Sequence, residues 1–231
     1  MARKRRKLSN TKARTLITKL NPRSPISEQY RTIRTNLQFA SVDKELQTMM
    51  VTSAGPSEGK SLTVSNLSVT FAQQGKKVLL IDADMRKPTL HYTFRLDNSL
   101  GLSSVLIGER SLEQVARESD VPGLDLIPSG PIPPNPSELL SSKAMKNFME
   151  LCKGQYDMVI FDMAPVLAVT DAQIMAAECD GVLLVTRSKQ TDIEAGKKAV
   201  ELLKQVKANI LGGVLNDVEA KRSNYYYYYG S

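Results

Sequence analysis

The sequence is poor in the residues on which several common classes of function depend. It has no tryptophan, one histidine (His91) and two cysteines (Cys152 and Cys179) in 231 residues. Two cysteines make neither a disulfide framework nor a zinc cluster, and one histidine argues against a His-based metal site or Ser-His-Asp chemistry. No apolar run approaches the roughly 20 residues that span a bilayer, and no apolar segment follows the basic N-terminus as in a secretory signal. We therefore expect a cytoplasmic protein.

The core predicted from the composition is aliphatic. Hydrophobic residues make up 42% of the chain and aromatic residues only 6%. Such a composition suits buried parallel β-strands better than an aromatic-rich all-β sandwich. The length fits one large domain better than two small ones.

Positive charge is concentrated at the N-terminus. The whole chain carries 31 Lys and Arg against 24 Asp and Glu, a formal charge of +7. Residues 1–23 contain nine of these basic residues and no acid, which leaves 22 basic against 24 acidic residues in the remainder, a net charge of −2. A basic arm is either a solvated, disordered tail or a segment that binds anionic lipid or nucleic acid. Because the body is slightly acidic, we favour a membrane surface or acidic partner and expect no nucleic acid.

Strands alternate with helices along most of the chain. Right-handed crossovers then give a doubly wound α/β fold, with a mostly parallel sheet covered on both faces. We expect a basic arm and linker over 1–25, the folded domain over 26–216 and a flexible tyrosine-rich tail over 217–231. The expected strands are 49–52, 77–82, 124–128, 158–162, 181–186 and 210–216, and the expected helices are 26–40, 62–74, 111–118, one from about 137, 171–178 and 192–206.

The loop after the first strand has the pattern of a phosphate-binding loop. Residues 54–61 read Ala-Gly-Pro-Ser-Glu-Gly-Lys-Ser, which matches Gly, four residues and Gly-Lys-Ser except that Ala54 replaces the first glycine. In such a loop, backbone N–H groups surround phosphate oxygens at the start of a helix, where the helix dipole favours anions. Lys60 is then placed to reach the β- and γ-phosphates and Ser61 to bind Mg²⁺.

Two later strands each end in carboxylates. One apolar strand runs into Asp82-Ala83-Asp84-Met85-Arg86, and another runs into Asp162-Met163-Ala164-Pro165. A doubly wound sheet binds its ligands at the carboxyl ends of its strands. An acid at a strand end is also a common helix cap, but together with Lys60 these acids indicate a site for Mg²⁺ and a nucleotide.

These motifs resemble the Walker A′ and Walker B motifs of the bacterial tyrosine kinases (BY-kinases) of the capsule and exopolysaccharide type. Three further segments fit that family: Glu28 to Arg34 as Glu-x-x-Arg-x-x-Arg, the proline-rich stretch 130–136, and a terminal tyrosine cluster. The resemblance spans about residues 24–231. The sequence departs from it at Met163-Ala164, where Thr and often a second Pro are common.

The resemblance implies an ATP- and Mg²⁺-dependent protein-tyrosine kinase that phosphorylates its own tail in trans. The implied catalytic residues are Lys60, Asp82, Asp84 and Asp162, with Asp82 more an orienting group than a strong base. Ser61 and the three aspartates are the implied Mg²⁺ site. The nucleotide-binding set is Gly55, Pro56, Ser57, Glu58, Gly59, Lys60, Ser61, Leu62 and Asn216, and the acceptors are Tyr225, Tyr226, Tyr227, Tyr228 and Tyr229.

The resemblance also implies partners. Glu28, Arg31 and Arg34 lie on one helical face. The resemblance implies that they join subunits of a closed ring, for example an octamer. The other interpretation of these three residues is ion pairing within the helix on a solvated surface. A transmembrane chain-length-regulator adaptor is expected to hold the kinase at the inner face of the membrane, and a phosphotyrosine phosphatase to reverse its reaction. The role implied for the kinase is to regulate capsular or exopolysaccharide synthesis and export.

Two alternative functions fit the sequence less well than a kinase. A MinD/ParA-type ATPase switch has a signature lysine early in its phosphate loop, where this chain has Gly55. That difference, with the tyrosine tail, favours the kinase. A non-catalytic module whose basic arm binds anionic surfaces leaves the phosphate loop and both carboxylate motifs unexplained.

Overall fold

The computed structural model describes residues 15–40 and 46–219. Seven strands form one sheet in the order β3-β4-β2-β5-β1-β6-β7, in which only the pair β3–β4 is antiparallel. The strands are β1 (Thr48–Ser53), β2 (Val78–Asp82), β3 (Arg117–Glu118), β4 (Leu124–Ile127), β5 (Met158–Asp162), β6 (Gly181–Arg187) and β7 (Ile210–Asn216). The helices are α1 (Ile17–Leu20), α2 (Pro25–Ala40), α3 (Lys60–Ala72), α4 (Leu90–Phe94), α5 (Leu102–Leu106), α6 (Leu112–Val115), α7 (Pro136–Leu140), α8 (Lys143–Lys153), α9 (Asp171–Ala176) and α10 (Ile193–Gln205).

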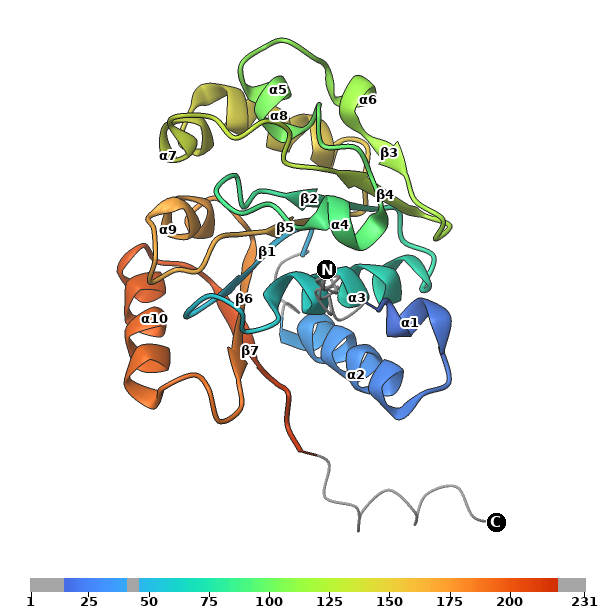
Figure 1. Ribbon diagram of the computed structural model, residues 1–231, viewed down its shortest axis with the longest axis vertical. Helices are drawn as coiled ribbons and strands as arrows, with labels where there is room; N and C mark the ends of the chain where they lie inside the picture. Colours follow the sequence, from blue (N-terminus) through green and yellow to red (C-terminus); the bar gives the residue numbers. More distant parts are fainter. Residues whose placement is uncertain (1–14, 41–45, 220–231) are drawn as a thin grey trace, which may run out of the picture.

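Helices cover both faces of the sheet, which confirms the predicted α/β fold. Helices α2, α3 and α4 lie on one face of the sheet, and α5, α6, α8, α9 and α10 lie on the other (Figure 1). Every residue of β1, β2 and β5 is buried. Strands covered on both faces are apolar throughout rather than alternating, and this explains why the sequence reveals them as short continuous runs.

The order of the strands brings the predicted motifs together. β1 lies between β5 and β6, and β2 pairs with β5 on the far side. All four strands are parallel, so the loops that follow β1, β2 and β5 leave the sheet at the same edge. The register pairs Asp82 with Asp162 directly.

The folded body starts earlier in the chain than the sequence analysis expects. Leu16 and Thr18 are buried, and α1 packs on α3. Thr18 is held by Asn66 of α3: its backbone N–H and its hydroxyl both donate to Asn66 Oδ1, at 3.1 and 2.9 Å. Leu16 and α1, which lie in the segment expected as a basic arm, therefore belong to the packed structure, and residues 1–14 lie outside the described residues.

The middle of the chain contains more short elements than predicted. The helix expected over 111–118 is a single turn, α6, followed by strand β3, and the helix expected from about 137 divides into α7 and α8. The Ser142 side chain caps α8 by accepting the N–H of Met145. In the described part of the chain, no helix is long and apolar enough to cross a bilayer.

Candidate active site

The predicted phosphate loop lies between β1 and α3. β1 ends at Ser53, and α3 begins at Lys60 after Gly59, whose φ of 89° is left-handed. Ser57 also has a positive φ, 64°, which is uncommon for a residue with a side chain. The loop thus curls sharply at the N-terminus of a 13-residue helix, where unpaired N–H groups and the helix dipole favour an anion.

Lys60 points into a buried acidic environment. Its Nζ lies 2.5 Å from Asp162 Oδ1 and 3.7 Å from Asp84 Oδ2, and it lies 3.4 Å from the hydroxyl of Ser61. Burial opposes the charge on the ammonium, but the carboxylates of Asp162 and Asp84 outweigh it and raise the pKa of Lys60. A lysine held charged at the start of a helix is suited to binding phosphate.

Asp82 is fully buried beside Asp162. Its Oδ2 accepts the N–H groups of Thr89 and Leu90, at 2.8 and 2.9 Å, and its Oδ1 accepts the N–H of Asp84. Burial and the neighbouring charge of Asp162 raise the pKa of the Asp82 carboxyl to about 7, despite these hydrogen bonds. Asp82 can therefore gain or lose a proton near neutral pH.

The carboxylates do not all converge on one point. Among the described residues, no group of three or more His, Cys, Asp or Glu side chains is placed to hold a metal ion. Asp82 instead uses both of its oxygens on backbone N–H groups. Direct ligation of one ion by all three aspartates therefore does not fit this geometry.

A smaller set of residues fits a hydrated Mg²⁺ ion. Asp162 Oδ2 is buried and has no hydrogen-bond partner, and the Ser61 hydroxyl interacts with the same carboxylate. A buried carboxylate oxygen without a partner is costly unless a cation or water occupies its free side. Oxygen ligands of this kind, with water completing the shell, suit Mg²⁺.

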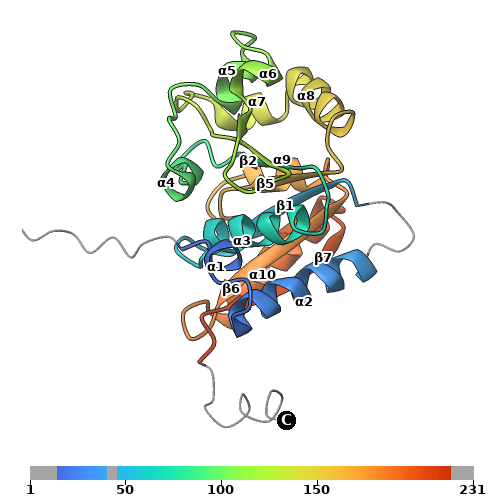
Figure 2. The same cartoon turned by 90° about the vertical axis from the view of Figure 1, so that its right-hand side faces the viewer.

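Asn216, the predicted adenine contact, ends β7 beside the phosphate loop. Its Nδ2 donates to the carbonyl oxygen of Glu58 at 3.0 Å. Asn216 also lines a groove of about 700 Å³ between α2 and β7, with Tyr30, Ile33 and Asp217 among the other lining residues. Both views in Figures 1 and 2 show α2 running beside β7.

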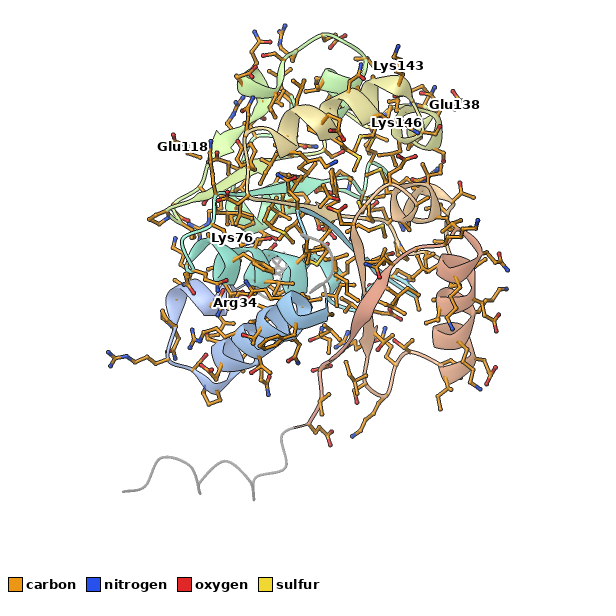
Figure 3. All side chains as sticks on the ribbon, turned by 180° about the vertical axis from the view of Figure 1, so that it is seen from behind. Arg34, Lys76, Glu118, Glu138, Lys143 and Lys146 are labelled. Atoms are coloured by element: carbon orange, nitrogen blue, oxygen red, sulfur yellow. The ribbon has the colours of Figure 1, made fainter. Side chains whose placement is uncertain are left out.

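The three residues predicted to join subunits make contacts within their own chain. Arg31 Nε donates to Glu28 at 2.8 Å within α2. Arg34 Nη1 donates to the carbonyl of Thr70 on α3 at 2.8 Å, and Figure 3 labels Arg34 where α2 meets α3. The ion pair between Glu28 and Arg31 is the intrahelical pairing given as the other interpretation of these residues. Their role in a subunit contact stays a prediction. Tyr225–Tyr229 lie outside the described residues.

Two features of the site were not predicted from the sequence. Arg86 binds the buried carboxylate of Asp171 through Nε and Nη2, at 2.9 and 3.0 Å, and Nη2 also donates to Ser137. Arg86 thereby ties the loop after β2 to α7 and α9. Thr191 donates to the carboxylate of Glu58, in the phosphate loop, at 2.6 Å. Arg86 does belong to the Asp-x-Asp-x-Arg motif, but no local signal marks Asp171 or Thr191.

Comparison with known proteins decides between the candidate functions. A family model described as an AAA domain matches residues 47–215. The tyrosine-protein kinase YwqD of Bacillus subtilis (strain 168) is 53% identical over 218 residues, which are 94% of this chain and 92% of YwqD. The chain belongs to the bacterial tyrosine-protein kinases. A putative tyrosine-protein kinase of Staphylococcus aureus, CapB, is 40% identical to the kinase over 210 residues, 90% of the chain and 92% of CapB.

Solved structures agree with this assignment. The kinase superposes on the chimerical protein CapA2B2 with a TM-score of 0.86 at 42% identity, covering 89% of this chain and 90% of that one. It also matches MinD of Pyrococcus horikoshii, complexed with Mg-ADP, with a TM-score of 0.62 at 23% identity over 73% of this chain and 69% of MinD. The likeness to MinD concerns the fold, and both the predicted family and the predicted enzyme class are confirmed.

Proposed function

We propose that the kinase binds Mg·ATP on the phosphate loop and transfers the γ-phosphoryl group to tyrosines of the C-terminal segment 225–229. The observation that carries this proposal is the position of Lys60: its ammonium is buried at the start of α3 and is held by Asp84 and Asp162. The N–H groups of the loop and the Lys60 ammonium would bind the phosphates. The groove beside Asn216 would accept the adenine.

Ser61 and Asp162 would hold Mg²⁺, with Asp84 reaching it through water. When bound, the ion neutralises charge on the phosphates. Lys60 contributes a second positive charge at the same place, because the acids around it keep it protonated. Charge neutralisation and positioning supply most of the catalysis in phosphoryl transfer, so these residues need not form a covalent bond.

Asp82 would orient the acceptor tyrosine and take its proton. In the transfer, the bond from the γ-phosphorus to the bridging oxygen of ADP breaks and a bond to the tyrosine oxygen forms. The phenolic proton passes to Asp82, and ADP leaves. Tyrosine has a pKa of about 10, and Asp82 with a pKa of about 7 accepts its proton more readily than an ordinary carboxylate does.

The acceptor tyrosines would belong to a neighbouring copy in a ring-shaped oligomer, for example an octamer. Glu28, Arg31 and Arg34 would take part in that contact. The kinase would act at the inner face of the membrane with a transmembrane adaptor and a phosphotyrosine phosphatase, and would regulate capsule or exopolysaccharide synthesis. In EpsB of Ralstonia nicotianae the matching part is 28% of a longer chain, which supports a link to a further region or partner.

Mass spectrometry of the intact protein and its peptides after incubation with Mg·ATP tests the proposal. We expect phosphate on Tyr225–Tyr229 in the wild type and none in Lys60→Met. Lys143→Met is the matched control, because Lys143 lies exposed at the start of α8 (Figure 3). Parallel reactions include the cytoplasmic tail of a candidate adaptor.

Hydrolysis of ATP by the wild type with an unmodified tail, even with the adaptor tail present, would contradict tyrosine transfer. It would favour a MinD/ParA-like ATPase switch. Absence of Mg·ATP binding in calorimetry would contradict the nucleotide site itself.

A further inference from the structure

The second half of the phosphate loop is held from outside by residues at the ends of β6 and β7. Thr191 Oγ1 donates to Glu58 Oε1 at 2.6 Å, and Arg187 Nη1 donates to the carbonyl of Ser57 at 3.2 Å. Asn216 Nδ2 donates to the carbonyl of Glu58. Two of these three contacts come from residues 187–191, the turn that connects β6 to α10. We call this segment the β6 turn.

The β6 turn has a fixed internal structure. The N–H groups of Gln190 and Thr191 donate to the carbonyl of Arg187, at 3.2 and 2.9 Å. In return, the Arg187 N–H donates to Thr191 Oγ1 at 2.7 Å. A hydroxyl has one proton, and because Thr191 accepts from Arg187, its own proton is directed to Glu58. The turn therefore presents one oriented donor to the phosphate loop.

Glu58 depends on that donor. Glu58 is only 4% exposed, and its second carboxylate oxygen, Oε2, is buried without a hydrogen-bond partner among the described residues. Within the described residues, the Thr191 hydroxyl is the one side-chain donor bonded to this carboxylate. Without it, a buried carboxylate would have no partner, and the loop would have to open to let water reach it.

The contact falls where the loop is strained. Ser57, the residue before Glu58, is held in the left-handed region at φ 64°. Such a conformation is energetically costly and persists only when the surrounding structure enforces it. Arg187 binds the carbonyl of Ser57 itself, and Thr191 binds the next side chain. Both contacts thus act on the residues whose geometry directs the loop N–H groups.

We propose that the β6 turn is a positioning element for nucleotide binding, in which Thr191, acting through Glu58, holds the phosphate loop in its anion-binding conformation. Arg187 supplies the second contact. Thr191 acts on the nucleotide site through its bond to Glu58 in the loop. This inference rests on the proposed nucleotide site.

The test compares Thr191→Val with Thr191→Ser in the full chain. Valine keeps the shape of threonine and loses the hydroxyl, whereas serine keeps the hydroxyl. We expect Thr191→Val to weaken Mg·ATP binding in calorimetry about tenfold, as for loss of one hydrogen bond to a charged group, and to raise KM for ATP with little change in kcat. Thr191→Ser restores the affinity. Thr186→Val, in the adjoining strand β6, where the threonine hydroxyl bonds no described residue, leaves it unchanged.

A double-mutant cycle with Glu58→Ala identifies the route. If Thr191 acts through Glu58, the tenfold effect of Thr191→Val shrinks strongly in the Glu58→Ala background. An equal effect in both backgrounds overturns the proposal, as does a Thr191→Val protein that binds Mg·ATP like the wild type. A Thr191→Val protein that loses its cooperative thermal transition, while Glu58→Ala;Thr191→Val keeps it, supports the unpaired carboxylate as the cause. Loss of the cooperative thermal transition in both the single variant Thr191→Val and the double variant overturns the proposal. Failure of the wild type to bind Mg·ATP is a different result, which contradicts the nucleotide site.

Discussion

Asp82 and Asp162 lie opposite each other in the adjacent parallel strands β2 and β5, and both side chains are fully buried. Lys60 forms an ion pair with Asp162 and leaves Asp82 to backbone donors. Burial raises the pKa of both carboxyls, and the charge of Lys60 opposes the rise at Asp162. Asp162 is compensated by the lysine, whereas Asp82 has a pKa of about 7.

The first prediction concerns stability. The pKa of Asp82 rises from 3.8 in an unfolded chain to about 7 in the folded one, so between these pH values the folded state binds more protons and stability falls as pH rises. Asp82→Asn removes this loss. The amide NH₂ of Asn cannot accept the backbone N–H bonded by the oxygen it replaces, a cost that is the same at every pH. We therefore expect the stability of the ligand-free variant, relative to the wild type, to be up to about 4 kcal/mol higher at pH 8 than at pH 4. Urea unfolding at both pH values measures the difference.

The control for this experiment is Asp97→Asn. Hydrogen bonds from Ser99 lower the pKa of this exposed carboxyl, so its removal gives no gain at pH 8. An Asp82→Asn protein whose stability relative to the wild type is the same at pH 8 as at pH 4 would contradict a raised pKa.

The second prediction concerns the pH dependence of phosphorylation. Only the ionised form of Asp82 accepts a proton, so kcat/KM should rise through a pKa near 7, the value in the free enzyme. Steady-state rates of tail phosphorylation between pH 5.5 and pH 9 measure the profile. Asp82→Asn should lose the rise together with most of the activity, and Asp84→Asn should keep the rise at a lower rate. A flat wild-type profile would exclude Asp82 as the titrating group.

The sequence predicts the parts of this site that lie within short segments. β1 with its phosphate loop, and the two apolar strands that end in Asp82 and Asp162, have local patterns of burial, glycine and charge that survive in the fold. Contacts between distant segments leave no such pattern. Thr191 and Glu58 are 133 residues apart, and Arg86 and Asp171 are 85 apart. The burial of α1 has no local signal because its anchors are distant in the chain: Thr18 bonds Asn66 of α3, 48 residues away, and its carbonyl accepts from Gln73, 55 residues away.

The third prediction tests that anchor. Thr18→Val keeps the shape of a fully buried side chain but removes the hydroxyl that donates to Asn66. We expect a loss of about 1–2 kcal/mol in the free energy of unfolding, the usual range for a buried hydrogen bond. Chemical denaturation measures it. Thr32→Val, on the exposed side of α2, should change stability by less than about 0.5 kcal/mol.

The fourth prediction compares two glycines. A Cβ on Gly101 would lie 2.1 Å from the carbonyl oxygen of Pro128 and 2.3 Å from the N atom of Gly130, and neither backbone atom can move away cheaply. Gly101→Ala should therefore cost more than about 3 kcal/mol. Gly196 lies inside α10 with open space around it, and Gly196→Ala should stabilise by about 0.5–1 kcal/mol. Thermal unfolding that gave both variants the same sign would refute the comparison.

The fifth prediction concerns the link between Arg86 and Asp171. Arg86→Met leaves the carboxylate of Asp171, which is fully buried, without its cation and should cost about 3 kcal/mol. Arg86→Lys keeps the charge but loses the two-point contact, so its cost should be intermediate. Arg117→Met is the control, because Arg117 is exposed and donates only to backbone carbonyls. Equal stability of all three variants in urea would show that the contact contributes nothing.

The spacing of the two buried acids has a consequence for how this enzyme can diverge. Asp82 and Asp162 are fixed relative to each other by the hydrogen-bond ladder between β2 and β5, not by the loops that follow them. A one-residue slip in that ladder would turn Asp82 to the opposite face, so the interior of the sheet tolerates little variation. The loop after β2 is fixed as far as Thr89 and Leu90, whose N–H groups bond Asp82, and the chain beyond them lies outside the ladder. Insertions and substitutions beyond that point can change the surface around the site while the pair of acids keeps its geometry, so relatives of this enzyme can differ there without losing the pair.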